Sequence, residues 1–442
     1  MLYNIEIWGC QMNEHDAEIL AGLIEQEGYR RTKDSEEADL VVLYTCCVRE
    51  KAEAKVLTRI GHLKKRKETQ PGFMLAVGGC MTQQQQVARY ISRQFKGVDL
   101  IFGTHNLHRF PELLREAASQ NQGILEVWDR EADQIAEQLP AARGDRIKAY
   151  VNIIYGCNNF CSYCIVPHVR GRERSRTVDS VAGEVRGLLE QGYREIMLLG
   201  QNVNSYGKDL DEPVDFATLL EVLDGLGDYR IRYMTSHPRD FSDRLIDTIA
   251  GTKNVCRQFH LPLQAGSNAV LRAMRRGYTK EGFLELIGKI GERFENPALT
   301  TDIIVGFPGE TEEDFEHTLD VVRQARFDQA FTFLYSPREG TPAATMDEQV
   351  PDGVKADRFN RLLELQNAIS LEKNQALTGR VVPVLVEGPS RNNEAVLSGR
   401  TEGSKVVNFP GPLSAVGTLV DVWITEARTW SLTGELAGEE QS

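Results

Sequence analysis

Three cysteines, Cys157, Cys161 and Cys164, share one short loop of this 442-residue chain, and no fourth cysteine lies nearby in the sequence. Grouped thiolates of this kind bind iron-sulfur clusters, and a cubane cluster contains four irons. Three protein thiolates leave one iron open, and an open iron on a redox-active cluster can bind a small molecule and pass it an electron. The spacing therefore predicts a 4Fe-4S cluster that performs chemistry, where a fully ligated cluster would only carry electrons.

The same loop has two other interpretations. His168 follows Cys164 by four residues, so the three cysteines and this histidine could form a closed Cys3His zinc site. Against zinc, residues 165–167 read as apolar chain leaving the loop and carry no finger turn. A disulfide framework is less favoured, because the chain is long, has only eight cysteines and carries no recognisable signal peptide. We therefore expect a reducing, cytoplasmic setting.

The loop also resembles a known superfamily. A CxxxCxxC spacing with an aromatic residue before the third cysteine, here Tyr163, is the hallmark of the radical S-adenosylmethionine (SAM) superfamily. The resemblance implies that SAM chelates the open iron and that the reduced cluster cleaves it to a 5′-deoxyadenosyl radical. It also implies that Tyr163 lies at the SAM site. The resemblance indicates the reagent but leaves the substrate undefined.

A second set of cysteines depends on the elements that precede it. Residues 3–8 alternate like a strand, 39–44 and 73–77 read as buried strands, and 13–27 and 48–67 have helical spacing. This βαβαβ pattern predicts a parallel sheet, whose strands all end at one edge.

Cys10, Cys46 and Cys80 each come just after one of these strands, so we expect their thiols to converge at that edge. Gly78 and Gly79 allow the backbone to approach a bulky ligand there. The convergence predicts a second 4Fe-4S cluster held by three thiolates.

The two remaining cysteines are expected to play other parts. Cys47 directly follows Cys46, and side chains of extended chain alternate, so its thiol should point away and stay free. Cys256 has no partner nearby in the sequence and is expected to pack in the core.

Residues from about 146 to 338 repeat strand and helix, which predicts a partial parallel α/β barrel with its site at the strand carboxyl ends. The expected strands are 151–155, 195–199, 231–235, 258–263, 299–305 and 330–335. Polar residues in or after these strands are predicted to contact SAM or substrate: Gln201, Asn202, Ser236, Gln264 and Asp302. Turn formation is the alternative, because turns favour the same residue types.

The composition changes after a long predicted helix at 352–377. Short strands at 381–386, 406–409 and 419–424 predict an all-β barrel of about 65 residues, a size common among oligonucleotide binders. Cations from Arg391, Arg400 and Lys405 and a stacking face from Phe409 could serve such binding. A purely structural β-cap is the alternative.

The composition, 41% hydrophobic and 26% charged, is typical of a soluble globular protein, and the length predicts about two or three domains. No apolar run is long enough to span a bilayer, so we expect no membrane association. The net charge of −13 does not favour nucleic acid, but basic groups within 64–67, 170–176 and 272–276 could meet phosphates. A solvated helix face is the alternative for 64–67.

Taken together, nearly the whole chain resembles the radical SAM methylthiotransferase family. The motifs are GCQMN at 9–13, TCCVREKAE at 45–53 and GQNVNSY at 200–206, and the REKA run at 49–52 discriminates best. These motifs are most similar to the members that modify isopentenyl-adenosine in tRNA. One departure is Cys47, where a small serine is usual in the family.

The resemblance implies an α/β multidomain fold with three parts. These are an N-terminal methylthiotransferase domain at 1–140, a radical SAM domain at 141–375 and an RNA-binding TRAM barrel at 376–442. It further implies two 4Fe-4S clusters and SAM as cofactors, and a tRNA anticodon stem-loop carrying isopentenyl-adenosine as partner. We also expect a flavodoxin-like or ferredoxin-like reductant and a monomer.

The implied reaction places a methylthio group on carbon 2 of the modified adenine, where a radical can break an inert C–H bond. The cluster of Cys157, Cys161 and Cys164 would generate the radical. The cluster of Cys10, Cys46 and Cys80 would hold a sulfur, which a first SAM methylates before a second SAM supplies the radical. Side chains would mainly position these parts, and the base would leave its stack to reach them.

Three other functions stay open at this point. Two lie within the family, with threonylcarbamoyl-adenosine in tRNA or an aspartate of a ribosomal protein as substrate. The third is of a different class, an RNA-binding iron-sulfur electron carrier without catalysis.

Overall fold

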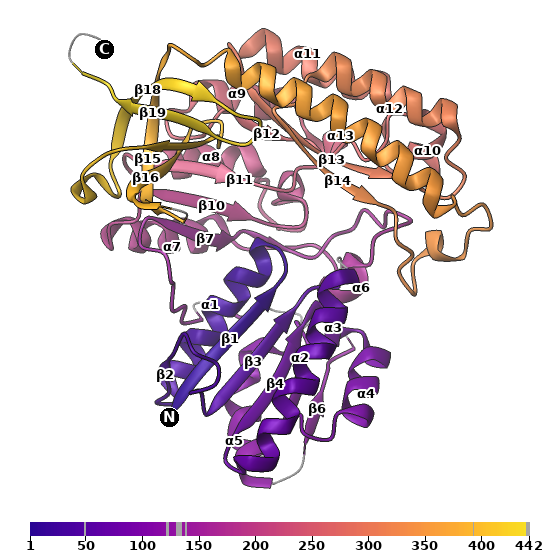
Figure 1. Cartoon of the computed structure of the whole chain (residues 1–442), viewed down its shortest axis with the longest axis vertical. Helices are drawn as coiled ribbons and strands as arrows, with labels where there is room; N and C mark the ends of the chain where they lie inside the picture. The colour runs from indigo at the N-terminus through magenta and orange to yellow at the C-terminus, as the bar shows by residue number, and fades with distance from the viewer. Residues whose placement is uncertain (48–49, 121–122, 130–134, 138, 392, 439–442) are drawn as a thin grey trace.

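The computed structural model describes residues 1–47, 50–120, 123–129, 135–137, 139–391 and 393–438. It consists of an N-terminal sheet, a central partial barrel and a C-terminal closed barrel, with the sheet below the other two in Figure 1. The predicted α/β multidomain class is confirmed. Residues 48–49, the second of which begins the discriminating REKA run, and the side chains of 50–52 lie outside the described part.

The N-terminal sheet is entirely parallel, with strand order β2-β1-β3-β4-β5-β6. Its strands are β1 (Leu2–Trp8), β2 (Arg30–Arg31), β3 (Leu40–Thr45), β4 (Met74–Gly79), β5 (Leu100–Phe102) and β6 (Ile124–Glu126). Its helices are α1 (Gln11–Gln26), α2 (Glu50–Thr69), α3 (Cys80–Gln83), α4 (Gln85–Gln94), η1 (Leu107–Arg109) and α5 (Phe110–Gln120). The predicted βαβαβ start is confirmed, while β2, β5 and β6 were not predicted.

Helices cover both faces of this sheet, which explains the continuous apolar run of β3. Leu40, Val42 and Tyr44 pack on the side of α1 and α5. Val41 and Leu43 pack on the side of α2 and α4. Successive side chains of β3 therefore enter two separate cores, and all of β3 is buried.

The central part contains two three-stranded parallel sheets, ordered β11-β10-β7 and β12-β13-β14. A single parallel bridge between Ile231 and Val255 leads from one sheet to the next. The strands are β7 (Lys148–Asn152), β10 (Glu195–Leu199), β11 (Arg230–Tyr233), β12 (Gln258–His260), β13 (Ala298–Val305) and β14 (Gln329–Leu334). The predicted partial barrel of six strands is confirmed, with ends that differ by a few residues.

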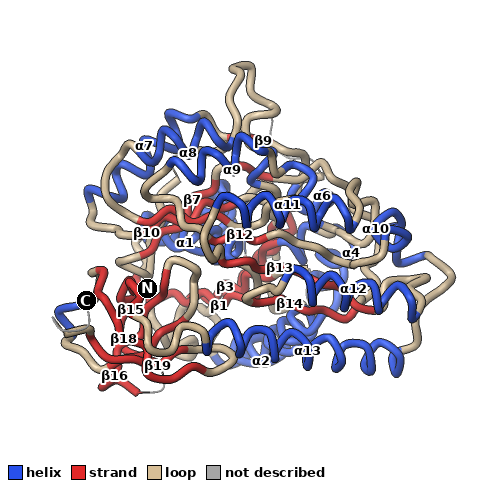
Figure 2. Tube along the Cα trace, turned by 90° about the horizontal axis from the view of Figure 1, so that it is seen from above, coloured by secondary structure: helices blue, strands red, loops and turns tan. Residues whose placement is uncertain are grey.

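Helices lie on the outer side of these strands, as the view in Figure 2 shows. The helices of the central part are α6 (Val166–Arg170), α7 (Val178–Glu190), α8 (Phe216–Asp224), α9 (Asp243–Gly251), α10 (Asn268–Ala273), α11 (Lys280–Arg293), α12 (Glu312–Ala325) and α13 (Asp352–Gln375), with the short turns η2 (Val203–Ser205), η3 (Pro238–Asp240) and η4 (Pro342–Thr345). Of these, α6 lies beside α3 of the N-terminal part. Six of these α-helices begin with a side-chain cap, from Thr177, Asp215, Ser242, Ser267, Thr279 or Thr311. These caps satisfy the free N–H groups of each first turn and fix where the helix starts.

The first predicted strand of the barrel is wrong at its end. β7 stops at Asn152, and Ile154–Tyr155 form β8, which pairs in antiparallel fashion with β9 (Arg174–Ser175). This small ribbon lies at both ends of the loop that carries Cys157, Cys161 and Cys164. It therefore anchors the loop at the carboxyl end of β7.

The C-terminal part is a closed barrel of order β15-β16-β17-β19-β18, as predicted, although two of its strands were missed. Its elements are β15 (Val381–Ser390), β16 (Asn393–Thr401), β17 (Val406–Phe409), η5 (Leu413–Ala415), β18 (Leu419–Ala427) and β19 (Leu432–Leu436). It packs against the amino ends of the central strands: the Arg232 guanidinium donates to the Thr401 carbonyl at 2.7 Å, and Lys148 pairs with Glu387 at 3.1 Å.

This packing corrects the predicted RNA contacts of the C-terminal barrel. Phe409 is fully buried in its core, so the prediction of a stacking face there is wrong. Lys405 pairs with Asp328 of the central part at 2.7 Å. Arg400 pairs with Glu387 at 3.2 Å. Lys405 therefore ties the barrel to the central part, whereas the Arg400 pair lies within the barrel, between β16 and β15.

Several arginines predicted to meet phosphate are buried instead. Arg170, Arg176 and Arg276 are at most 7% exposed. Arg176 pairs with Glu184 at 2.6 Å. The phosphate prediction is therefore wrong for these three arginines, because their charges are used inside the fold. In the described part of the chain, no helix is long and apolar enough to cross a membrane.

Candidate active site

Strands β1, β3 and β4 are neighbours that run in the same direction (Figure 1), and one cysteine follows the end of each. Cys10 caps α1, Cys46 follows β3, and Cys80 opens α3. Gly79 has a φ of +106°, and a Cβ on it would lie 2.4 Å from the Thr45 carbonyl oxygen. Only glycine permits this close approach of β3 and β4, which brings the ends of both strands together.

Asn13 joins two of these cysteines. Its Oδ1 lies 3.6 Å from Cys10 Sγ and 3.8 Å from Cys80 Sγ. Its Nδ2 is buried and has no hydrogen-bond partner among the described residues. The structure thus brings Cys10 and Cys80 together as predicted, and Cys46 lies buried at the end of the strand between theirs.

The orientation of the Cys47 side chain differs from the sequence prediction. Its thiol does not point away but hydrogen-bonds with Cys80, and both pack against Ile165 and Val169. The alternation rule does not apply, because β3 already ends at Thr45 and Cys47 lies in a bend. Cys256 is buried, and its predicted packing role is confirmed.

The hydrogen bond from Cys47 lowers the pKa of Cys80 to about 6, against the opposing effect of burial. The Arg170 guanidinium adds to this lowering. Cys80 is therefore a thiolate near neutral pH, which is the form that binds metal.

Arg170, the last residue of α6, reaches into the N-terminal part. Its Nε lies 3.2 Å from Cys80 Sγ, and one terminal nitrogen donates to Asn13 Oδ1 at 3.1 Å. The other terminal nitrogen pairs with Asp16 at 2.7 Å, and Asp16 also accepts from the Tyr44 hydroxyl at 3.0 Å. A charged residue of the central part is thus enclosed beside the cysteines of the N-terminal sheet.

The loop of the other cysteine set is held by its own backbone. The Cys157 amide donates to the Gly171 carbonyl at 3.1 Å, and the Cys164 amide donates to the Cys161 carbonyl at 3.0 Å. Gly156 has a φ of +74°, and a Cβ there would lie 1.9 Å from the Arg172 carbonyl oxygen. The turn at Gly156 therefore requires glycine.

The guanidinium of Arg276 lies next to the sulfur of Cys161, as that of Arg170 lies next to the sulfur of Cys80. Its Nη1 lies 3.3 Å from Cys161 Sγ, and its Nε donates to the Tyr278 hydroxyl at 3.2 Å. Tyr163 packs beside this group, partly buried against a cluster that includes Tyr278 and Phe307. The predicted SAM contact of Tyr163 stays a prediction.

Two thiols of this loop, those of Cys157 and Cys164, differ from Cys80 in their protonation. Burial raises the pKa of Cys157 to about 11 and that of Cys164 to about 12. Metal binding at this loop must therefore displace protons, so it depends on pH.

The predicted polar residues gather at the ends of β10 and β11. Ser236 Oγ is buried without a hydrogen-bond partner among the described residues, and so is the side-chain oxygen of Asn202, Oδ1. Asn202 also donates to Asp240 at 2.9 Å, so it shapes the loop as well. Gln201 donates to the thioether sulfur of Met12, close after Cys10 in the sequence, and its own side-chain oxygen has no partner among those residues.

The other two predictions fall on β13 and its neighbour. Gln264 has a φ of +67°, and its backbone N–H donates to the backbone carbonyl of Asp302 at 2.8 Å. The Asp302 carboxylate lies 3.4 Å from His260 Nε2. Thr235 also has a positive φ, of 68°, which is costly for a β-branched residue. Strained backbone at strand ends is a feature of functional sites.

Sequence reasoning missed two further polar residues here, Asn204 and His237. The Asn204 amide and the His237 Nε2 are buried without partners in the described part of the chain. Burial, and then the charge of Arg276, lowers the pKa of His237 to about 3, so the ring is neutral. Asn204 lies within the GQNVNSY motif, which offered a signal for it.

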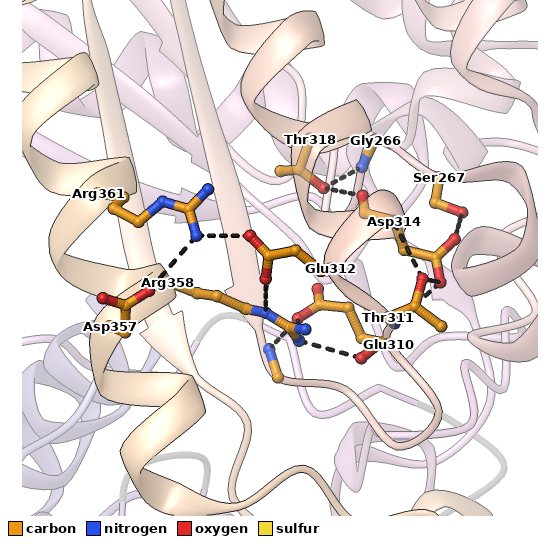
Figure 3. Close-up of polar contacts among 11 residues, drawn as sticks. Gly266, Ser267, Glu310, Thr311, Glu312, Asp314, Thr318, Asp357, Arg358 and Arg361 are labelled. Carbon is orange, nitrogen blue, oxygen red and sulfur yellow. Dashed lines mark hydrogen bonds and ion pairs between the residues drawn. The ribbon is translucent and has the colours of Figure 1, made fainter.

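An ionic network fixes the loops behind these strands (Figure 3). Buried Glu310 accepts from the Gly306 amide at 2.8 Å and pairs with Arg358 of α13 at 3.0 Å. Burial outweighs this pair and raises the pKa of Glu310 to about 7. Next to it, the Thr318 hydroxyl accepts from the Gly266 amide at 2.8 Å. The network ties the loops after Gln264 and after β13 to α12 and α13.

The two cysteine sets meet at one interface. Ile165, which directly follows Cys164, packs against Cys47 and Cys80. The contact of Gln201 with Met12 brings the end of β10 to the start of α1. The mouth of the central barrel therefore faces the cysteine edge of the N-terminal sheet.

Among the described residues, no three His, Cys, Asp or Glu side chains converge closely enough to hold a single metal ion. A mononuclear site needs all its ligands around one point, whereas each thiolate of a cubane binds a different iron. His168, the fourth ligand of the zinc alternative, is exposed, and its ring packs edge-on against Phe160 at 6.3 Å. The zinc interpretation gains no support from this arrangement.

The two cysteine sets and the polar residues at the strand ends fit the two 4Fe-4S clusters and the SAM that the sequence predicted. Each cysteine set supplies only sulfur donors, and each has a buried arginine next to one thiol. The unpartnered amide, hydroxyl and imidazole atoms at the strand ends suit a polar ligand with several donors and acceptors. Cys157, Cys161 and Cys164 would hold one cluster, and Cys10, Cys46 and Cys80 would hold the other.

Family models match three stretches of the chain. They are the Radical SAM superfamily at residues 151–322, the Uncharacterized protein family UPF0004 at 2–103 and the TRAM domain at 375–437. The solved structure of the radical S-adenosylmethionine methyltransferase TsrM from Kitasatospora setae, with tryptophan and a SAM analogue, has a TM-score of 0.56 and 14% identity. It covers 83% of this chain and 89% of that chain, and it supports the fold alone.

Curated relatives match far more closely. The tRNA-2-methylthio-N(6)-dimethylallyladenosine synthase of Alkaliphilus oremlandii is 56% identical over 99% of this chain and 93% of the relative. The proteins of the same name from Acetivibrio thermocellus and Desulforamulus reducens are each 54% identical over 98% of this chain, and the matches span 91% and 95% of those relatives. This near-full-length identity confirms the resemblance that the motifs indicated, and the chain belongs to the tRNA-2-methylthio-N(6)-dimethylallyladenosine synthase family.

Proposed function

We propose that this enzyme adds a methylthio group to carbon 2 of the isopentenyl-adenosine beside the anticodon of tRNA. The observation that carries the proposal is the meeting of the two cysteine sets, because Ile165 packs against Cys47 and Cys80 immediately after Cys164. One nucleobase at this interface would reach both sets. The names of the relatives support the same substrate.

Cys157, Cys161 and Cys164 would hold the 4Fe-4S cluster of the radical SAM site, and Cys10, Cys46 and Cys80 would hold a second one. When bound, these clusters and SAM supply the radical chemistry and the sulfur transfer. The second cluster is supported by the convergence of Cys10 and Cys80 on Asn13. The low pKa of Cys80 also favours metal binding there.

The chain's own residues position the reactants. We assign SAM contacts to six side chains at or near the barrel mouth: Tyr163, Gln201, Asn202, Ser236, Gln264 and Asp302. Buried atoms of Gln201, Asn202 and Ser236 without partners among the described residues support the assignment of these three, because an unused buried polar group costs free energy until a ligand fills its hydrogen bond. His237 Nδ1 accepts from the Arg239 backbone amide, so the neutral ring has its proton on Nε2 and can donate one hydrogen bond there without bringing a charge.

We also propose the bounds of three domains: a methylthiotransferase domain at 1–140, a radical SAM domain at 141–375 and a TRAM barrel at 376–442. The C-terminal barrel would contact the tRNA through surface groups that its packing leaves exposed. Trp430 is 56% exposed and lies close in sequence to Arg428, and together they offer a stacking face and a cation. We further propose a flavodoxin-like or ferredoxin-like reductant, a monomer and a cytoplasmic setting.

Mass spectrometry of tRNA nucleosides tests the substrate. A strain that lacks the gene should lose the methylthio group from isopentenyl-adenosine, and the wild-type gene should restore it. Loss from threonylcarbamoyl-adenosine, or from a ribosomal aspartate, would assign the enzyme to a different substrate. The purified protein should also form 5′-deoxyadenosine from SAM, and its failure to do so would favour an electron carrier.

A further inference from the structure

Arg170 is a buried cation that connects the two parts of the proposed active site. It ends α6, the helix that follows the Cys157–Cys164 loop, yet its guanidinium contacts three residues of the N-terminal part: Cys80, Asn13 and Asp16. The side chain is 7% exposed. A structural ion pair alone would need Asp16, but it would not require a second nitrogen to face a thiol.

The guanidinium distributes its donors among different partners. One terminal nitrogen pairs with Asp16, and the other donates to Asn13 Oδ1, which also contacts Cys10. The remaining Nε faces Cys80 Sγ at 3.2 Å. Arginine holds several fixed N–H directions at once, so the anchored terminal nitrogens determine where Nε points.

We propose that Arg170 is a positioning residue of the second cluster site, which holds Cys80 by an N–H···S bond and raises the reduction potential of the cluster bound there. This inference rests on the proposed function, because it requires the second cluster. Reduction adds negative charge to a cluster. A cation and an N–H donor at a ligand sulfur therefore stabilise the reduced form.

Arg276 provides the matched case at the other site, since its Nη1 faces Cys161 Sγ at 3.3 Å. Each arginine should therefore affect the cluster that it touches and leave the other unchanged. Arg232 provides a structural control, because it is also buried but pairs with Glu195 and donates to the C-terminal barrel.

The experiment isolates the second cluster. A full-length parent carrying Cys157→Ala, Cys161→Ala and Cys164→Ala is reconstituted under anaerobic conditions, and its midpoint potential is measured by a redox titration followed by electron paramagnetic resonance. Arg170→Gln is expected to lower this potential. Arg170→Lys keeps the charge but loses the fork, so it should give a value between those of Gln and the parent. Arg276→Gln and Arg232→Gln should leave it at the parent value.

Each outcome has a defined meaning. A parent-like potential in Arg170→Gln or in Arg170→Lys, at full iron content, would overturn the inference. Loss of iron from both variants, with circular dichroism like that of the parent, would support the positioning role of Arg170 through Cys80. If the parent itself binds no cluster, the proposed second cluster fails, which is a different result from an unchanged potential.

Discussion

The two cysteine sets place three thiols each at one interface, but they are built in opposite ways. Cys157, Cys161 and Cys164 lie in one loop, anchored by the β8–β9 ribbon. Cys10, Cys46 and Cys80 lie far apart in the sequence, and three neighbouring parallel strands bring them to one edge. The first set depends on a local turn, whereas the second depends on the whole sheet being formed.

The two sets also differ in charge. A hydrogen bond from Cys47 lowers the pKa of Cys80 to about 6, while burial raises the pKa of Cys157 to about 11. Cys80 is thus a thiolate before metal binds, whereas burial raises the pKa of Cys10 at the same edge and of Cys157 and Cys164 in the loop. Both sets place a buried arginine beside one sulfur. The common feature is the cation, and the difference lies in which protons must leave when metal binds.

The largest expected difference between the two cysteine sets is the effect of a cysteine substitution on catalysis. Cys161→Ala should abolish SAM cleavage, because it removes a ligand of the radical cluster. Cys46→Ala should spare SAM cleavage and abolish methylthio insertion. Assays of 5′-deoxyadenosine and of the tRNA nucleoside measure both activities. Equal loss of SAM cleavage in the two variants would contradict this division of labour.

The difference in protonation can be measured on the metal-free protein. Alkylation requires the thiolate, so the rate at Cys157 should rise about tenfold per pH unit below its pKa, or about 100-fold from pH 7 to 9. Cys80 should react at a nearly constant rate over this range, because its pKa of about 6 lies below it. Peptide mass spectrometry after timed iodoacetamide treatment gives both rates. Parallel pH profiles would remove the proposed contrast.

Two glycines allow the sites to be damaged separately. Gly79→Ala places a Cβ 2.4 Å from the Thr45 carbonyl oxygen, and Gly156→Ala places one 1.9 Å from the Arg172 carbonyl oxygen. The reconstituted enzyme should hold about eight irons, and each variant should lose about four of them. Only Gly156→Ala should lose SAM cleavage as well.

Gly183→Ala is the control for this pair, since a Cβ there meets nothing within 4 Å. It should keep all the iron and gain about 0.5–1 kcal/mol of stability from its position inside α7. Iron analysis and thermal unfolding report these results. A full iron content in Gly79→Ala would show that the close approach of β3 and β4 is not needed for the second cluster.

The sequence predicted that Cys10, Cys46 and Cys80 each follow a strand of one parallel sheet, because strand ends follow from local patterns. It could not predict their surroundings, because those depend on distant partners. Arg170 lies 157 positions from Asn13 and 90 from Cys80, so no spacing rule connects them. Cys47 was misplaced because the alternation of β3 stops before it.

For the C-terminal barrel, too, the sequence predicted the type of fold but not the surroundings of individual side chains. Its overall size and type followed from short apolar runs, but β16 and β19 were missed because glycine and polar residues interrupt their alternation. Phe409 was taken for a surface group, yet it fills the barrel core. A cation or an aromatic ring in a β-rich segment has no fixed side until the strand order is known.

The smallest expected effect concerns the barrel mouth that both cysteine sets share. Ser236→Ala removes a buried hydroxyl that has no partner among the described residues, so thermal stability should stay level or rise. The KM for SAM should increase about fivefold to tenfold, as expected for one lost hydrogen bond.

Ser370→Ala is the matched control for Ser236→Ala. The Ser370 hydroxyl is also buried, but it donates to the Asp328 carbonyl at 2.9 Å, away from the strand ends. Its loss should cost about 1 kcal/mol of stability and leave the KM unchanged. An unchanged KM in Ser236→Ala, or a loss of stability as large as that of the control, would make Ser236 a turn residue. The strand ends would then contribute less to SAM binding than the cysteine loop does.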